Sequence, residues 1–302
     1  MRDMRELTGK GRAQSAMEYL MTYGWAILVI AVVLGVLFEL GVFNPANLGP
    51  RAQPGSCHVY RPNGPGTSLL LNLEGVCNGA LPEYAASFNG NNQYIYSNVT
   101  GMPTGNSSRT VTAWFSDSDV SPRLTLFWYG ATTCSNPSVP PRFFQIYIQS
   151  GGIIMNAWCT DQGIYGNPQQ NVWYFVAYEY NKSAQEQIGY VGAAGEMYSA
   201  SSITYNSYNT TPTPFYMGNG NGGGYFAGME SNVQIYNTTL SSNTIQSLYQ
   251  EGIGGAPTDL KNLVAWYPLN GNAQDYSGNN NNGQEVNGAT FTSQWMNGYT
   301  AP

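Results

Sequence analysis

An apolar run near the N-terminus constrains this chain more than any other feature. Tyr19 to Phe43 spans 25 residues and contains one charged side chain, Glu39. As a helix rising 1.5 Å per residue, the run would reach about 37 Å, enough to cross a hydrocarbon core of about 30 Å. Basic residues are concentrated before the run and only Arg51 follows closely. The positive-inside rule therefore predicts that residues 44–302 lie outside the cytoplasm.

Three kinds of segment could account for this run. A secretory signal peptide has an apolar stretch of about 7–15 residues and a small-residue cleavage site, whereas this run is longer and lacks such a site. A permanent single-span anchor fits the length and the distribution of charge. The residues immediately before the run favour a third explanation.

Residues 10–28 read KGRAQSAMEYLMTYGWAIL, with a basic leader, a glutamine, small residues and a glutamate four positions after the glutamine. This order resembles the class III signal peptide of archaeal type IV pilin-like proteins. The resemblance implies that a prepilin peptidase cuts between Ala13 and Gln14, so that residues 1–13 are a leader. Residues 14–43 would then form a transmembrane helix that is later packed in the core of a filament.

Glu18, Tyr19 and Leu20 would belong to the assembly region of that helix. The resemblance implies that the Glu18 carboxylate pairs with the N-terminal amine of a neighbouring subunit, and an unpaired carboxylate at this place would be costly to dehydrate. The simpler alternative is that Glu18 lies in the headgroup layer, favoured by the helix dipole. The implied partners are copies of this chain, a pilus assembly machinery and, before assembly, the membrane.

Two kinds of residue agree with an extracellular location for the rest of the chain. All four cysteines follow the apolar run. The simplest pairing joins Cys57 to Cys77 and Cys134 to Cys159, while four cysteines allow three pairings. There are also five N-x-Ser/Thr sequons, the acceptor motif for N-linked glycans, at Asn98, Asn106, Asn181, Asn209 and Asn237.

Beyond the helix the composition is that of a turn-rich β protein. Charged residues make up 9% of the chain, against about 25% in an ordinary soluble domain, and aromatic residues make up 14%. A net charge of −6 argues against nucleic acid as a partner. Prolines and glycines crowd residues 44–57, which we interpret as a linker that ends the helix.

Short β-type runs alternate with Gly-, Asn- and Pro-rich turns after the linker. Their number and spacing predict an antiparallel β-sandwich over residues 58–255, and together with the N-terminal helix this gives an α+β chain. One helix is expected at Ser242–Glu251, with Ile245, Leu248 and Tyr249 on one face. The expected strands are Thr67–Asn72, Gln93–Tyr96, Arg109–Ser116, Leu124–Trp128, Phe143–Ile148, Ile153–Trp158, Val172–Tyr180 and Asn232–Tyr236.

The order of these segments resembles LamG-like, concanavalin-type jelly rolls. Residues 86–95 (ASFNGNNQYI) resemble the opening of that family, residues 110–115 its first long strand and residues 224–241 its closing strand and helix. Residues 263–279 resemble the segment that normally begins such a domain. We therefore predict that residues 256–302 add edge strands to the same sandwich. The alternative is that they pair with a neighbouring subunit.

Few residues point to catalysis or metal binding. Glycoside hydrolysis needs two facing carboxylates, and the closest candidates, Asp117 and Asp119, fall in one turn. A single histidine, His58, disfavours zinc, and the one carboxylate in the loop from Asp275 to Asn279 is too few for calcium. We therefore predict no enzymatic activity, metal or cofactor. Sugar binding stays open, because tyrosine and tryptophan pack on sugars and asparagine hydrogen-bonds their hydroxyls.

The sequence as a whole predicts a structural subunit of an archaeal pilus-like adhesion filament. It would be made as a membrane-inserted precursor and end in a filament on the cell surface, where surface glycans are further candidate partners. The alternative is a membrane-anchored carbohydrate-binding surface protein that never polymerises. The two differ in processing, because the filament subunit would begin at Gln14 and the anchored lectin would keep residues 1–13.

Overall fold

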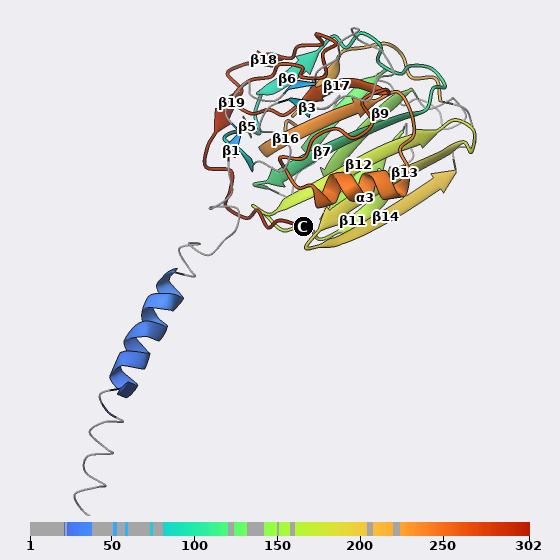
Figure 1. The fold of residues 1–302 in the computed structure, drawn as a ribbon. Coiled ribbons are helices and arrows are strands. Elements are labelled where there is room, and N and C mark those ends of the chain that lie inside the picture. Colours follow the sequence, from blue (N-terminus) through green and yellow to red (C-terminus); the bar gives the residue numbers. More distant parts are fainter. Residues whose placement is uncertain are drawn as a thin grey trace, which may run out of the picture. The chain divides into compact units, whose positions relative to one another are not determined.

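The structure is a computed structural model, drawn in Figure 1. It describes residues 21, 23–37, 51–52, 58–59, 73–74, 81–119, 124–131, 142–149, 151–157, 161–203, 208–219 and 224–302. The chain divides into two units, Met1–Leu48 and Gly49–Pro302, and each is described by itself.

In the first unit, residues 23–37 form an α-helix. Its apolar side chains are exposed on every side, with Trp25 at 66%, Ile27 at 65% and Val36 at 51%. The helix rises about 22 Å. Within the described ranges, no helix is long and apolar enough to cross a membrane. The predicted helix over residues 14–43 extends beyond the described residues at both ends.

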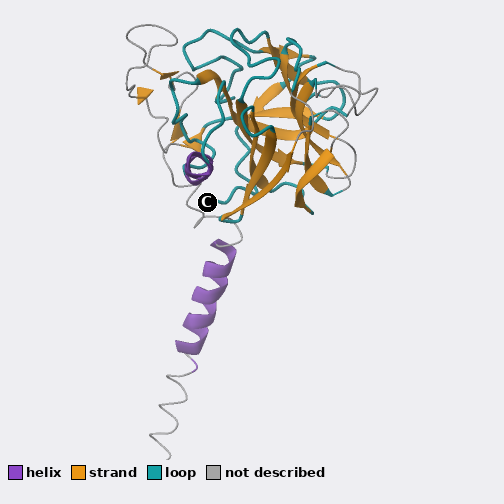
Figure 2. Ribbon diagram, turned by 90° about the vertical axis from the view of Figure 1, so that its right-hand side faces the viewer, coloured by secondary structure: helices purple, strands orange, loops and turns teal. Residues whose placement is uncertain are grey.

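The second unit is a sandwich of two antiparallel sheets, as predicted (Figure 2). The seven-stranded sheet has the order β11 (Asp161–Gly166), β10 (Gly152–Asn156), β9 (Phe143–Gln149), β8 (Leu124–Gly130), β15 (Phe215–Met217), β6 (Tyr94–Ser97) and β18 (Gln284–Val286). The eight-stranded sheet has the order β14 (Glu196–Ile203), β13 (Glu186–Ala193), β12 (Trp173–Asn181), β7 (Arg109–Asp117), β16 (Ala227–Tyr236), β5 (Ala85–Asn89) and β19 (Thr290–Thr292), with β17 (Leu263–Tyr267) also paired to β16.

Two short pairs accompany the sandwich. Strand β1 (Arg51–Ala52) pairs in parallel with β4 (Leu81–Pro82). Strand β2 (His58–Val59) pairs in antiparallel fashion with β3 (Leu73–Glu74). His58 therefore lies in a strand pair, and no cluster of metal-ligating side chains occurs among the described residues.

Side-chain alternation decides which residues enter the core between the two large sheets. Phe215 and Met217 of β15 belong to the buried apolar cluster, whereas Tyr216 between them points to the opposite face. On β7, Val111 and Phe115 point into the same cluster. Each sheet therefore has an inner apolar face that contributes to the core and an outer face that points away from it.

Helix α3 (Ser242–Gln250) covers part of the outer face of the eight-stranded sheet (Figure 2). The hydroxyl of Ser241 caps it by accepting a hydrogen bond from the backbone N–H of Thr244 at 3.1 Å. The ring of Tyr249 stacks on Trp114 of β7, with centroids 5.8 Å apart. The predicted helix is confirmed, and its buried residues are Ile245, Leu248 and Tyr249.

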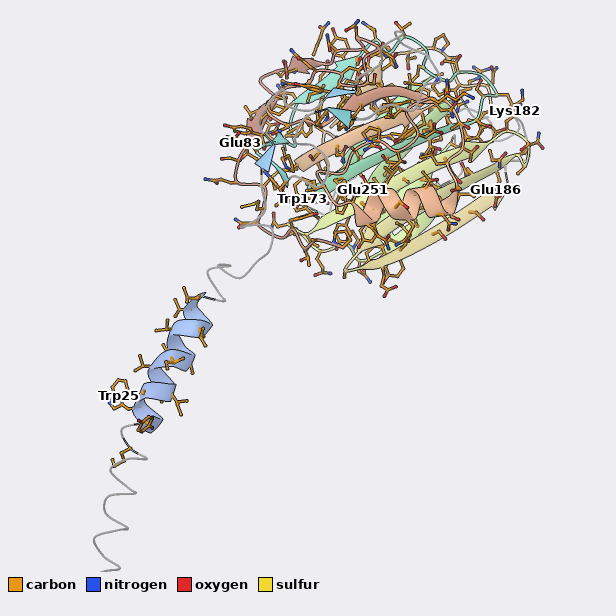
Figure 3. All side chains as sticks on the ribbon, in the orientation of Figure 1. Trp25, Glu83, Trp173, Lys182, Glu186 and Glu251 are labelled. Carbon is orange, nitrogen blue, oxygen red and sulfur yellow. The ribbon has the colours of Figure 1, made fainter. Side chains whose placement is uncertain are left out.

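The C-terminal segment contributes strands to both sheets of its own chain. Strand β17 pairs with β16, β19 with β5, and β18 with β6. Its last residues also cover the eight-stranded sheet. The indole Nε1 of Trp173, labelled in Figure 3, donates to the carbonyl oxygen of Trp295 at 2.7 Å, and Tyr299 packs edge-on against Trp114.

The loop that follows β17 is held together by Asp275. Its Oδ1 accepts hydrogen bonds from the backbone N–H groups of Trp266 (2.9 Å) and Ser277 (2.8 Å). Its Oδ2 accepts from the hydroxyl of Ser277 and the backbone N–H of Asn281, both at 2.9 Å. The carboxylate considered for calcium therefore fastens its own loop to β17.

Candidate functional site

The processing, assembly and disulfide residues lie outside the described residues, namely Ala13, Gln14, Glu18, Tyr19, Leu20, Cys57, Cys77, Cys134 and Cys159. The sequon asparagines are all described. Asn98, Asn209 and Asn237 are exposed, whereas Asn106 and Asn181 are half-buried.

The outer face of the seven-stranded sheet carries a continuous row of aromatic and amide side chains. Tyr96 of β6 pairs across the strands with Tyr216 of β15, which pairs with Trp128 of β8. The same line continues to both edges of the sheet. We call the seven aligned residues the cross-strand row: Gln284, Tyr96, Tyr216, Trp128, Gln145, Asn156 and Asp161.

The aromatic rings of the row lie next to one another. The rings of Trp128 and Tyr216 lie 4.9 Å apart with 8° between their planes, and those of Tyr216 and Tyr96 lie 6.2 Å apart. Tyr94 extends this cluster, at 6.0 Å from Tyr216 and 6.3 Å from Tyr225. The nearly parallel rings of Trp128 and Tyr216 cover one face of each other, whereas the rings of Tyr216 and Tyr96 are tilted by 31°. The accessible part of the row consists of the half-buried Tyr96 and Tyr216 and the exposed Gln284 and Asp161, whereas Trp128, Gln145 and Asn156 are buried.

Polar groups of the row are partly satisfied within the protein. Tyr96 donates its hydroxyl to Gln284 Oε1 at 2.7 Å, and Gln145 donates from Nε2 to Thr125 Oγ1 at 2.9 Å. Trp128 is 7% exposed, and its Nε1 has no hydrogen-bond partner among the described residues. The Nε1 atom is itself buried, so this unpaired N–H costs about 1–3 kcal/mol within the fold.

The row is neutral over most of its length. Its one ionisable carboxylate, Asp161, lies on the edge strand β11, and none of the seven side chains is a cation. Burial, followed by the neighbouring Tyr94 and Tyr96, raises the pKa of Tyr216 above its usual value of 10.0. The phenol of Tyr216 therefore keeps its proton at neutral pH and remains a hydrogen-bond donor.

The carboxylates considered for catalysis lie in the other sheet. Asp117 ends β7, and its Oδ1 accepts a hydrogen bond from the backbone N–H of Asp119 at 2.9 Å. Burial raises the pKa of Asp117 to about 6, although this hydrogen bond opposes the shift. Glu230 of β16 is fully buried, which raises its pKa well above the usual range. Neither residue belongs to the row, so the row holds no facing pair of carboxylates.

The architecture and the aromatic outer face define a lectin-like β-sandwich. Residues 89–246 match the Laminin_G_3 model of the concanavalin A-like lectin/glucanases superfamily. This match covers just over half of the chain, and the chain belongs to that superfamily. The search of curated proteins gave no match.

Solved structures are similar to this chain at low sequence identity. A candidate carbohydrate-binding protein from Bacteroides ovatus is 19% identical, with a TM-score of 0.54, and the alignment covers 70% of this chain and 60% of that one. A SAP-like pentraxin from Limulus polyphemus is 13% identical over 69% and 94% of the two chains, with a TM-score of 0.48. The sialidase CBM40 of Ruminococcus gnavus bound to α2,3-sialyllactose is 16% identical over 57% and 96%, with a TM-score of 0.42.

The sequence left sugar binding by aromatic side chains open and did not indicate which residues would take part. Tyr216 lies on a strand of three residues that was not predicted, because Pro212 and Pro214 precede it and Gly218 follows it. One feature of the sequence did indicate an aromatic outer face, because Tyr94 and Tyr96 alternate with the buried Ile95. The pairing that brings the three aromatic strands together joins residues far apart in the sequence.

Proposed function

We propose that this chain is a carbohydrate-binding protein of the cell surface, and that its sandwich binds a neutral glycan at the cross-strand row. The observation that carries the proposal is the alignment of Gln284, Tyr96 and Tyr216 on one sheet face, with the ring of Trp128 stacked beside Tyr216. The tyrosine hydroxyls and the Gln284 amide can hydrogen-bond sugar hydroxyls, and aromatic rings can pack on the C–H groups of a sugar. The neutral row offers no cation to an acidic sugar.

The row supports binding rather than hydrolysis. Cleavage of a glycosidic bond requires two carboxyl groups that flank it. Asp161 is the only carboxylate in the row and lies at its edge. The superfamily includes both lectins and glucanases, so the fold does not decide between binding and hydrolysis. The residues of the row support binding.

A glycan array with the Gly49–Pro302 unit tests the proposal. We expect binding to neutral oligosaccharides, with little change in Kd between about 50 and 500 mM salt, because no charge pair is formed. Trp128→Ala and Tyr216→Ala should each weaken binding at least tenfold. The matched control is Tyr198→Ala, since Tyr198 is 43% exposed on β14 of the other sheet. Equal binding by the Trp128 variant and the wild type would contradict the assignment of the row.

A second proposal concerns the first unit. We infer that the chain is made as a membrane-inserted precursor and assembles through its N-terminal helix into a surface filament. The motif over residues 10–28 supports this proposal. So does the exposure of apolar side chains on all sides of helix 23–37, because lipid or other helices must cover them in the cell.

The first residue of the native protein distinguishes a filament subunit from a membrane-anchored protein that does not polymerise. A filament subunit should begin at Gln14, as judged by the mass of its N-terminal peptide. Surface protein that still begins at Met1 would contradict filament processing and leave an anchored carbohydrate-binding protein.

A further inference from the structure

Two sequons lie at the end of the eight-stranded sheet where β7 begins. Asn181 ends β12, and the preceding residue, Tyr180, pairs with Arg109 at the start of β7. Asn237 follows β16, whose last residue pairs with Thr110. Both asparagines therefore lie at the same end of the sandwich.

The other three sequons lie at this end as well. Asn98 follows β6, where Ser97 pairs with Phe215 at the start of β15. Asn106 and Asn209 precede β7 and β15, and their loops are joined by a bridge between Gly105 and Thr210. We call this end of the sandwich the sequon pole.

Direct contacts connect these loops. The hydroxyl of Tyr180 donates to Asn106 Oδ1 at 2.6 Å, and the backbone N–H of Lys182 donates to Ser108 Oγ at 3.1 Å. Figure 3 labels Lys182 at one end of the sandwich and Trp173, the first residue of β12, towards the other. Five motifs spread over residues 98–239 thus lie at one end of the sandwich.

Exposed asparagines are also present at the opposite end, but they lie outside sequons. Asn89 pairs with Ala227 at the start of β16, and the backbone N–H of Asn171 donates to the carbonyl oxygen of Asp117 at the end of β7. Sequons that arose only from the abundance of Asn, Ser and Thr would be expected at both ends. The exposed asparagines of the opposite end that lack Ser or Thr two residues on are Asn89, Asn91, Asn92, Asn171 and Asn287.

We propose that the sequon pole carries a cluster of N-linked glycans, with Asn98, Asn209 and Asn237 as its main acceptors. These three side chains are exposed. The two half-buried asparagines are engaged in the fold. Asn106 accepts the Tyr180 hydroxyl, and Asn181 Oδ1 accepts hydrogen bonds from the turn that follows it. The proposal rests on the proposed function in one respect, because the sandwich must lie outside the cytoplasm.

Asn98 connects the sequon pole to the cross-strand row. Ser97 is buried and donates its hydroxyl to the carbonyl oxygen of Asn281, and Val99 packs against the core. Because side chains alternate between the two faces along a strand, Asn98, two residues after Tyr96, points to the same outer face as Tyr96. A glycan on Asn98 would start beside the row.

Glycopeptide mass spectrometry of the full-length protein, isolated from the surface of the cells that make it, tests this proposal. We expect glycan mass on Asn98, Asn209 and Asn237, and none on asparagines of the opposite end. Asn→Gln at each of the three should lower the intact mass by one glycan. Asn91→Gln, an exposed control at the opposite end, should leave the glycan mass unchanged.

Surface protein in which all three peptides are unmodified would overturn the glycan cluster. If that protein still binds sugars on the array, the proposed function stands and only the glycan cluster fails. Glycosylated protein that binds no sugar, even after Asn98→Gln removes the glycan beside the row, would overturn the proposed function alone. Unmodified protein recovered only from inside the cell would overturn both.

Discussion

Arg109 is a buried cation whose described partners are all neutral. It is fully buried between the two sheets. It donates to Tyr129 Oη (2.9 Å), Thr210 Oγ1 (2.8 Å) and the carbonyl oxygens of Ser107 and Gly105. Its guanidinium carbon also lies 5.4–5.8 Å from the centroids of four aromatic rings. One side chain therefore joins β7, β8 and the loops of the sequon pole.

We expect Arg109→Lys to lower the free energy of unfolding by about 2–4 kcal/mol, although the charge is kept. A lysine ammonium cannot donate along the four directions that the guanidinium satisfies, and buried acceptors would lose their partners. Urea unfolding measures the difference. Lys182→Arg, at an exposed turn, is the control and should change stability by less than about 0.5 kcal/mol. A lysine variant as stable as the wild type would contradict this role.

Glu179 couples stability to pH. Burial raises the pKa of this carboxyl from 4.5 to about 7, Tyr190 lowers it through a hydrogen bond to Oε1, and the charge of Glu186 raises it. Between these two values the unfolded chain has released the proton while the folded protein still holds it. Stability must therefore fall as pH rises from about 4.5 to 7.

We expect Glu179→Gln to remove this part of the pH dependence. The variant should gain stability over the wild type as pH rises from about 5 to 7.5, because glutamine stays neutral in both states. Chemical denaturation at a series of pH values measures the effect. Stability curves that stay parallel across this window would show that Glu179 does not retain its proton on folding.

At the scale of elements, helix α3 depends on a glycine in the sheet beneath it. A Cβ on Gly192 of β13 would lie 2.4 Å from the ring of Tyr249. Tyr249 also accepts a hydrogen bond on its hydroxyl from the backbone N–H of Gly195 at 2.9 Å. The absence of a side chain at position 192 therefore allows the ring to lie flat against the sheet and α3 to dock.

Gly192→Ala should destabilise the protein by about 1–3 kcal/mol, because the added methyl group forces Tyr249 and the helix away from the sheet. The shift would be measured as a lower Tm and as faster hydrogen exchange in residues 242–250. Gly163→Ala on β11 is the matched control, since its Cβ would meet no atom within 4 Å. Equal effects at the two glycines would rule out the docking explanation.

The elements predicted from sequence are those with strong local patterns. Seven of the eight expected strands overlap strands in the structure, and the eighth, Thr67–Asn72, lies outside the described residues. Strand β13 was not predicted, since its glycines interrupt the apolar run. Strand β14 was not predicted because its Ser-rich sequence resembles a loop, and pairing with β13 orders it.

At the scale of the whole molecule, residues 256–302 complete both sheets. Their side chains enter the common core, including Ala265, Tyr267 and Leu269. Removing residues 256–302 would leave β16, β6 and β5 without one of their paired strands and would expose unpaired strand edges. The C-terminal segment is therefore part of the folding unit of the sandwich.

Truncation after Ala256 should give an insoluble chain or one without a cooperative unfolding transition. The lost core contacts and the exposed edges account for this expectation. Solubility and near-UV circular dichroism measure it. Residues 257–302 supplied as a separate chain should restore part of the folded protein. A truncated chain that unfolds like the intact one would show that the segment is dispensable.

The sequon pole and the cross-strand row are expected to interact through Asn98. On glycosylated protein, Asn98→Gln should strengthen binding of a free neutral oligosaccharide several-fold, because it removes a glycan that competes for the row. Asn237→Gln is the control, since Asn237 follows a strand of the other sheet. Isothermal titration calorimetry measures both. Equal affinity for the two variants would indicate that the Asn98 glycan does not reach the row.

The sequence by itself determined an apolar N-terminal segment, an antiparallel β-sandwich, helix α3 and the five sequons, because each follows from a local pattern of apolar, turn or acceptor residues. Only the tertiary structure decided which aromatics share a face. Tyr96, Trp128 and Tyr216 form one row because strand register aligns them, and register depends on pairing between distant segments. The same pairing gathers five scattered sequons at one end. Local sequence patterns therefore determine the helices and strands, while pairing between distant segments determines which residues share a surface.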